Sequence, residues 1–257
     1  MAMAEAGANF DIGRVIQRTI ALVGRNFVPF FVLALVLTGL PALILQTVLP
    51  TDPAAIQNAP GSYATTFFIG LLVSLATGVV LQGALTRAVI DDLSGKGVRL
   101  GEAVSNAVAL ILPLIGLGIL LGLGVLAGMV FLIVPGVYLA LCWIVASPVM
   151  VVERLGVVAS MQRSMKLTQN HRWAILGLLV LFFIGYMIVG AVIAALVGGS
   201  LANLANPGGP PLPFLILMTL IGVVVSVVGT VGVAAIYFEL RQIKDGVGVT
   251  ELAQVFS

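Results

Sequence analysis

The feature that most restricts the fold of this chain is the interval between Glu102 and Glu153, in which no residue is charged. A second uncharged interval separates Arg172 from Glu239. Because an α-helix crosses the hydrocarbon core of a membrane with about 20 apolar residues, each interval has room for two crossings. The chain is 60% hydrophobic and only 9% charged, which is too little charge to cover a soluble domain of this length. The sequence therefore predicts an all-α, polytopic integral membrane protein that forms a single membrane domain over residues 1–257.

Six spans are expected, in the segments left between the polar and Pro-rich stretches. Pro135 and Gly136 mark the reversal between the third and fourth spans, and Pro148 predicts a kink in the fourth. Residues 1–26 are expected to form a cytoplasmic amphipathic segment, and residues 241–257 a cytoplasmic tail. The expected spans lie near residues 27–49, 63–85, 108–130, 137–152, 173–197 and 214–237.

The lysine and arginine residues show on which side the loops lie. All 12 fall before the first span, after the last span, or in the loops that follow the second and fourth spans. None lies in the other three loops, where Asp52 is the only charged residue. Since cytoplasmic loops carry an excess of lysine and arginine, both termini are expected in the cytoplasm.

Each pair of spans follows a short segment of mixed polarity, which predicts a threefold repeat of one amphipathic helix plus a hairpin of two spans. Ile16–Ile20 in the first copy matches Met161–Met165 in the last, and Gly101–Ala107 is a weaker middle copy. In the first copy the arginines share one helical face and isoleucines share the other, so the helix is expected to lie in the headgroup layer.

Two interpretations of these basic residues stay open. The side chains can bind the phosphates of anionic lipids or a partner protein. Alternatively, the amphipathic helices are topology anchors that pack against neighbouring loops. The predicted lipid-headgroup or partner contacts are Arg14, Arg18, Arg25, Arg163, Lys166, Arg172 and Arg241.

Small residues recur at every fourth position of three spans. Such rows let helices approach closely in lipid, where apolar surfaces alone provide little attraction. They predict tight packing either within the monomer or in a homo-oligomer. The predicted packing residues are Gly118, Gly122, Gly190, Ala194, Gly222 and Ser226.

Residues for catalysis or metal binding are few. His171 is the only histidine and Cys142 the only cysteine, which excludes a histidine metal cage and an intrachain disulfide. A proton or ion pathway usually requires an ionisable residue in the middle of a span. None of the expected spans has one. No cofactor is expected, and a net charge of +2 gives no reason to expect nucleic acid as a partner.

The adjacent carboxylates Asp91 and Asp92 resemble half of a metal site, whose other half would come from Glu102, Glu153 or Glu239. The alternative is a network of salt bridges that fixes the three repeats relative to one another. The expected members of that network are Asp91, Asp92, Glu153 and Glu239 with Arg163, Arg172 and Arg241.

Several motifs carry a family resemblance: Val134–Leu141, Pro148–Glu153, Arg163–Thr168 followed by His171–Trp173, Tyr237–Arg241, and the opening Phe10–Gly13. They resemble the membrane domain that accompanies some bacterial glycerophosphoryl diester phosphodiesterases. In the two-part members of that family a separate barrel domain hydrolyses the substrate, and no such domain is expected here. The resemblance therefore implies a membrane architecture and a bacterial inner-membrane location, and no catalytic residue.

Three functions fit these features. The first is a non-enzymatic scaffold or partner subunit that binds membrane lipids and a protein partner or a second copy of itself. The second is a transporter or channel for a lipid or small amphipathic solute, with a cleft between the repeats. The third is an enzyme that acts on lipid headgroups with the acidic residues near Asp91.

Overall fold

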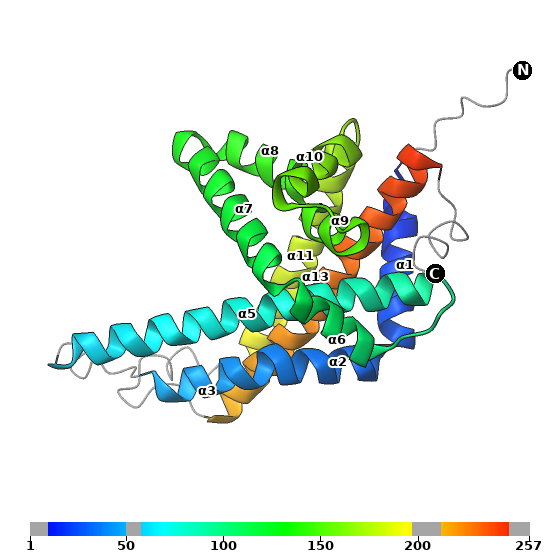
Figure 1. Cartoon of the computed structure of the whole chain (residues 1–257). Coiled ribbons are helices and arrows are strands. Elements are labelled where there is room, and N and C mark those ends of the chain that lie inside the picture. Colours follow the sequence, from blue (N-terminus) through cyan, green and yellow to red (C-terminus); the bar gives the residue numbers. More distant parts are fainter. Residues whose placement is uncertain (1–9, 50–57, 197–211, 247–257) are drawn as a thin grey trace, which may run out of the picture.

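The computed structural model describes residues 10–49, 58–196 and 212–246, and in these ranges the chain is built of helices (Figure 1). They are α1 (Ile12–Arg25), α2 (Phe27–Ala34), the π-helical turn η1 (Leu35–Gly39), α3 (Leu40–Val48), α5 (Pro60–Leu93), α6 (Leu100–Ala109), α7 (Ile111–Phe131), α8 (Ile133–Trp143), α9 (Ala146–Glu153), α10 (Val157–Thr168), α11 (Arg172–Leu196) and α13 (Leu212–Asp245).

Six helical segments in the described ranges are long and apolar enough to cross a membrane, which confirms the expected all-α polytopic class. They are Phe27–Val48, Gly61–Leu93, Ile111–Val130, Ile133–Glu153, Arg172–Val192 and Leu212–Asp245. A short helix precedes each pair of these segments: α1, α6 and α10, in that order. Figure 1 shows α1 lying across the ends of α5 and α13 rather than alongside them.

Two of the long helices continue beyond their expected ends. α5 extends to Leu93 and α13 to Asp245, past residues 85 and 237. Hydropathy detects only the part of a helix at membrane depth, whereas the charged last turns stay helical because their side chains find ion-pair partners. Residues 247–257 of the expected tail lie outside the described ranges.

Pro148 breaks the fourth span, as expected. α8 ends at Trp143 and α9 begins at Ala146, so the break falls about four residues before the proline. Proline lacks the N–H that would bond to the fourth preceding carbonyl, and its ring crowds that carbonyl. Next to the break, Ser164 Oγ of α10 donates a hydrogen bond of 2.8 Å to the Cys142 carbonyl. This buried contact joins the third short helix to the fourth span.

The reversal between the third and fourth spans was expected at Pro135 and Gly136 and lies instead at Leu132. Proline fits the first turn of a helix because the N–H groups there have no intrahelical partner. A Cβ on Gly136 would lie 2.9 Å from Met129 N, so this glycine serves a close contact between α7 and α8 rather than a turn.

The glycines expected at packing contacts do not make them within the chain. Gly118, Gly122, Gly190 and Gly222 are exposed, and no atom of the described residues lies within 4 Å of a Cβ built on any of them. In the described ranges these four glycines therefore make no packing contact within the monomer, and contact with a second copy stays a prediction. Ser226 is half-buried, and the side chain of Ala194 lies outside the described residues.

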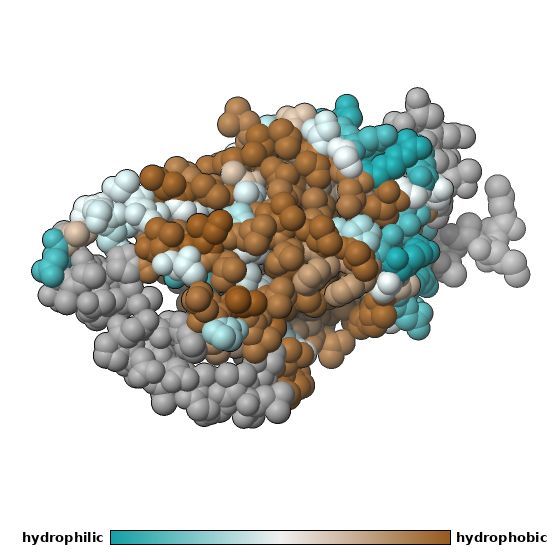
Figure 2. All heavy atoms as spheres, turned by 90° about the horizontal axis from the view of Figure 1, so that it is seen from below, coloured by the Kyte–Doolittle hydropathy of each residue, from teal (hydrophilic) through white to brown (hydrophobic). Residues whose placement is uncertain are grey.

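α13 is the central helix of the bundle. It contacts α1, α2, α3, α5, α9 and α10, and its buried residues are densest from Val231 to Leu240. Figure 2 shows a wide apolar band on the surface, with hydrophilic residues gathered at one end of the molecule. That end, called the charged end below, comprises α1, α6, α10, the last turns of α5, α9 and α13, and the first turn of α11.

Candidate functional site

At the centre of the charged end is the carboxylate of Glu239, which is fully buried on α13. Arg14 Nη1 and Arg18 Nη1 of α1 lie 2.7 Å and 2.6 Å from its two oxygens. Arg18 also donates to the side chain of Gln242 at 3.1 Å and stacks over the ring of Phe238. Both arginines were predicted to contact lipid or a partner. Their pairing with Glu239 instead supports the interpretation of α1 as an anchor that packs on its neighbours.

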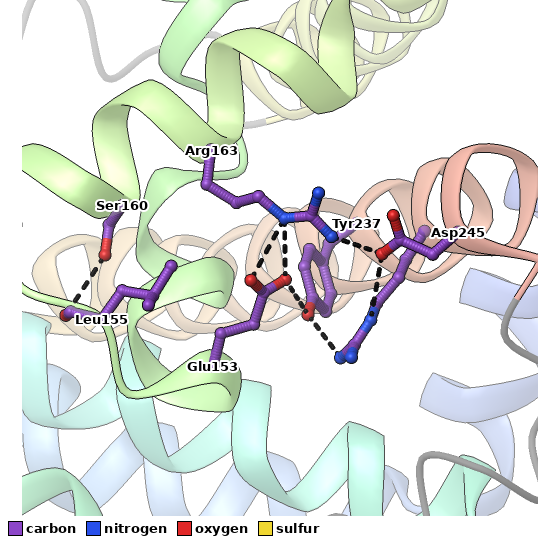
Figure 3. Close-up of polar contacts among 7 residues, drawn as sticks. Glu153, Leu155, Ser160, Arg163, Tyr237 and Asp245 are labelled. Carbon is purple, nitrogen blue, oxygen red and sulfur yellow. Dashed lines mark hydrogen bonds and ion pairs between the residues drawn. The ribbon is translucent and has the colours of Figure 1, made fainter.

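A second network joins α9, α10 and α13 (Figure 3). Arg163 Nε of α10 lies 3.1 Å from Glu153 Oε2 of α9, and its Nη2 pairs with Asp245 of α13. Tyr237 donates its hydroxyl proton to Glu153 at 3.1 Å and accepts from Arg241 at 3.0 Å. Burial alone would lower the pKa of Arg163, but the hydrogen bond and charge of Asp245, together with Glu153, raise it, so this guanidinium stays charged.

The predicted salt-bridge network therefore exists, with partly different members. Glu239 pairs with arginines of the first repeat rather than with Arg163 or Arg241. Asp245 was assigned to the tail and was missed, although it binds both Arg163 and Arg241. The helical spacing of Arg241 and Asp245, four residues apart, was the available signal.

The two aspartates considered for a metal site are each held by an arginine. Asp91 pairs with Arg87 of the same helix at 3.1 Å, and Asp92 pairs with Arg25 at the end of α1. The proposed second half of that site is also engaged, since Glu102 pairs with Arg99 at 3.2 Å. In the described ranges, no three metal-binding side chains come together.

His171 lies in the turn before α11, where its ring is 6.2 Å from the ring of Phe10. Burial lowers the pKa of His171 below its usual value, and the positive charge of Lys244 lowers it further. The imidazole is therefore neutral near pH 7. Its position beside an aromatic ring is that of a packing residue at the membrane interface.

Acidic and basic residues are distributed differently at the charged end. Every acidic residue in the described ranges takes part in an ion pair with an arginine: Asp11, Asp91, Asp92, Glu102, Glu153, Glu239 and Asp245. By contrast, four basic residues show no ion pair with a carboxylate there: Arg154, Lys166, Arg172 and Lys244. We call these four residues the basic rim. Lys166 and Arg172 are the members predicted from the sequence.

Arg172 of the basic rim lies at the mouth of a groove between α8 and α11, with a volume of about 590 Å³. The groove is lined mostly by apolar side chains, and its polar groups come from Tyr138, Asn170 and Arg172. The Arg172 guanidinium bonds to the Tyr138 hydroxyl and lies 4.6 Å from the centre of that ring.

A second, mostly apolar groove opens sideways between α11 and α13. Although these two spans are consecutive, they approach each other only loosely over the described residues. Two hollows of about 420 and 490 Å³ lie between them, and both are lined by Phe182 and Val228. The first reaches α1 and the second reaches Phe31 of α2, so the groove is continuous along the bundle.

No family model, curated protein or solved structure matches this chain. The resemblance to the membrane domain of glycerophosphoryl diester phosphodiesterases therefore stays a prediction.

Proposed function

We propose that this protein is a non-enzymatic module of the bacterial inner membrane that binds anionic lipid or an acidic protein partner at a cytoplasmic charged end. The observation that carries this proposal is the unequal pairing of charges. Arginines neutralise the acidic side chains of the described chain, whereas the basic rim keeps its positive charges for another molecule. The ion pairs of Glu239 join α1 to α13, and those of Arg163 join α10 to both α9 and α13, so together they hold the surface that carries the rim.

The lipid part of this function is tested by thermal unfolding of the full chain in nanodiscs of phosphatidylcholine with and without phosphatidylglycerol. Phosphatidylglycerol is expected to raise the unfolding temperature of the wild type. The triple variant Arg154→Gln, Lys166→Gln, Lys244→Gln should lose most of that gain, since each cation near an anionic surface contributes about 1 kcal/mol.

The matched control is Arg99→Gln, because Arg99 is equally exposed but pairs with Glu102. An equal rise in unfolding temperature for the triple variant and the wild type would contradict lipid binding by the basic rim.

Extraction in a mild detergent tests whether the protein binds a protein partner. A defined protein that remains bound would support a partner subunit, and a clean monomer without ordered lipid would contradict the proposal.

The cytoplasmic orientation rests on the sidedness of the basic residues and has its own test. In a Cys142→Ala background, Lys96→Cys should react with an impermeant maleimide only after the membrane is opened. Ser62→Cys, at the exposed start of α5, should react in intact cells. The opposite pattern would invert the proposed topology.

The groove between α11 and α13 favours a second candidate, a transporter for a lipid or small amphipathic solute. A lateral, apolar groove next to α1 is a surface on which the acyl chain of a bound lipid or the apolar part of a solute can lie. Proteoliposomes with a fluorescent lipid distinguish the two candidates. Faster exposure of the inner-leaflet probe to an impermeant quencher would establish transport, whereas the scaffold leaves the rate unchanged.

A further inference from the structure

The groove between α8 and α11 differs from the two hollows between α11 and α13 because a charged residue, Arg172, is among its lining residues. Ile133, Val134, Val137, Leu141 and Leu176 form an apolar wall. Trp173, at the opening, is 85% exposed. An exposed tryptophan beside an arginine at the first turn of a membrane helix is typical of the boundary between headgroups and acyl chains. The groove therefore has an end suited to headgroups and a wall suited to acyl chains.

Arg172 is incompletely satisfied by the chain itself. Its Nη1 bonds to the Tyr138 hydroxyl and its Nη2 to the Met165 carbonyl at 3.4 Å, and both of these acceptors are neutral. Its Nε is buried without a hydrogen-bond partner. A buried guanidinium N–H usually has an acceptor, and a charged group at a membrane interface usually has a counter-ion. Arg172 thus has both a free donor and an uncompensated charge.

A second copy of the chain does not supply this counter-ion well. Each acidic residue in the described ranges already pairs with an arginine, so a helix from a second copy would bring an apolar surface and no free carboxylate. A free phosphate would satisfy Arg172 but would leave the apolar wall uncovered. A glycerophospholipid provides both parts in one molecule, in the order in which the groove presents them.

We propose that this groove is a binding site for one anionic glycerophospholipid, with its phosphate on Arg172 and one acyl chain against Val134, Val137 and Leu176. The proposal rests on the proposed function, because it names the lipid class and the place where one molecule is held. Asn170, which also lines the groove, can donate a hydrogen bond from its amide to the glycerol or headgroup oxygens. The Tyr138 ring beneath the guanidinium keeps Arg172 facing the groove.

Native mass spectrometry of the full chain, titrated with phosphatidylglycerol in detergent, tests this site. One tightly bound lipid per protein is expected for the wild type. Arg172→Gln should weaken that first binding step about five- to tenfold, the value of one interfacial cation. Val134→Trp, which fills the groove without changing charge, should weaken it by a similar factor. Val134 is 77% exposed, so the larger side chain can be accommodated without disturbing the core.

Two matched controls accompany these variants. Arg99→Gln removes an exposed arginine elsewhere at the charged end, and Val130→Trp adds the same ring at a position that is 78% exposed and outside the groove. Both should bind the first lipid as the wild type does. Wild-type elution volume and unfolding temperature will verify that the groove variants are folded.

Unchanged binding in either groove variant would overturn the proposal. So would equal competition by glycerophosphoglycerol, the headgroup without acyl chains, because the site would then recognise phosphate alone. The triple rim variant separates this result from the proposed function. If the triple variant loses the stabilisation by phosphatidylglycerol while the groove variants bind lipid normally, the lipid site in the groove is contradicted and the proposed function is supported. If only the groove variants lose lipid, the site stands without a contribution from Arg154, Lys166 and Lys244.

Discussion

Replacement of Glu239 by glutamine is expected to release α1 from the bundle and to lower the stability of the protein by about 3 kcal/mol. The carboxylate of Glu239 is fully buried and is the shared partner of Arg14 and Arg18. Glutamine keeps the size but not the charge, so two arginines that face a buried position lose their counter-ion. Arg14 is half-exposed and can turn to water, whereas the side chain of Arg18 is only 25% exposed and bears most of the cost.

Two measurements check this result. The unfolding temperature in nanodiscs should fall by roughly 6–12 °C for a domain of this size. Limited trypsin digestion should cut α1 at Arg14, Arg18 and Arg25 well before the other helices, since the helix would no longer be held against α13. A lower unfolding temperature without faster cleavage of α1 would show that Glu239 stabilises the fold in some other way than by holding α1.

Glu102→Gln is the matched control. Glu102 also pairs with an arginine, but both side chains are more than 60% exposed. Such surface pairs contribute about 0–1 kcal/mol, so the variant should unfold and digest as the wild type does. A combined Arg18→Met, Glu239→Met variant should regain part of the lost stability, because removal of both charges leaves neither one buried alone. Equal behaviour of the Glu239 and Glu102 variants would contradict the structural role given to Glu239.

The number and class of the membrane helices were predictable from the sequence because lipid imposes a simple requirement. Each crossing must be apolar over about 20 residues and must satisfy its backbone internally, and the uncharged intervals show this directly. The short helices α1, α6 and α10 were also predictable, since their mixed polarity distinguishes them from the spans.

The partners of individual charges were harder to predict. Arg14 and Glu239 are separated by 225 residues, and no local pattern shows which repeat supplies the arginine for a given carboxylate. Arg172 was expected in a salt bridge and instead contacts the Tyr138 hydroxyl of α8. Such contacts depend on helix tilt, which periodicity does not determine.

The same reason explains the glycines. Small residues occur on several faces of α7, and sequence alone does not tell which face meets a neighbour. The structure places Gly124 against the Trp143 ring and Gly128 against Gly136, while Gly118 and Gly122 face outward. A matched pair of substitutions in this hairpin can therefore separate a glycine that is required for packing from one that is not.

Gly136→Ala is expected to destabilise the α7–α8 hairpin by about 2 kcal/mol, a typical cost of overpacking. A Cβ at Gly136 would lie 2.3 Å from Met129 Cγ, 2.9 Å from Met129 N and 3.1 Å from Met129 Cα. The methionine side chain can move, but the backbone atoms cannot move without separating the two helices. Because close approach is the main attraction between helices in lipid, this separation should lower the unfolding temperature by roughly 4–8 °C.

Gly122→Ala on the same helix is the control, since a Cβ there meets nothing within 4 Å. Alanine favours helix over glycine by about 1 kcal/mol, so this variant should be as stable as the wild type or slightly more stable. The contrast depends only on the neighbour of the added methyl group. Equal effects of the two substitutions would contradict the close contact between α7 and α8. A fall in stability for Gly122→Ala alone would instead place a second copy of the chain on the outward face of α7.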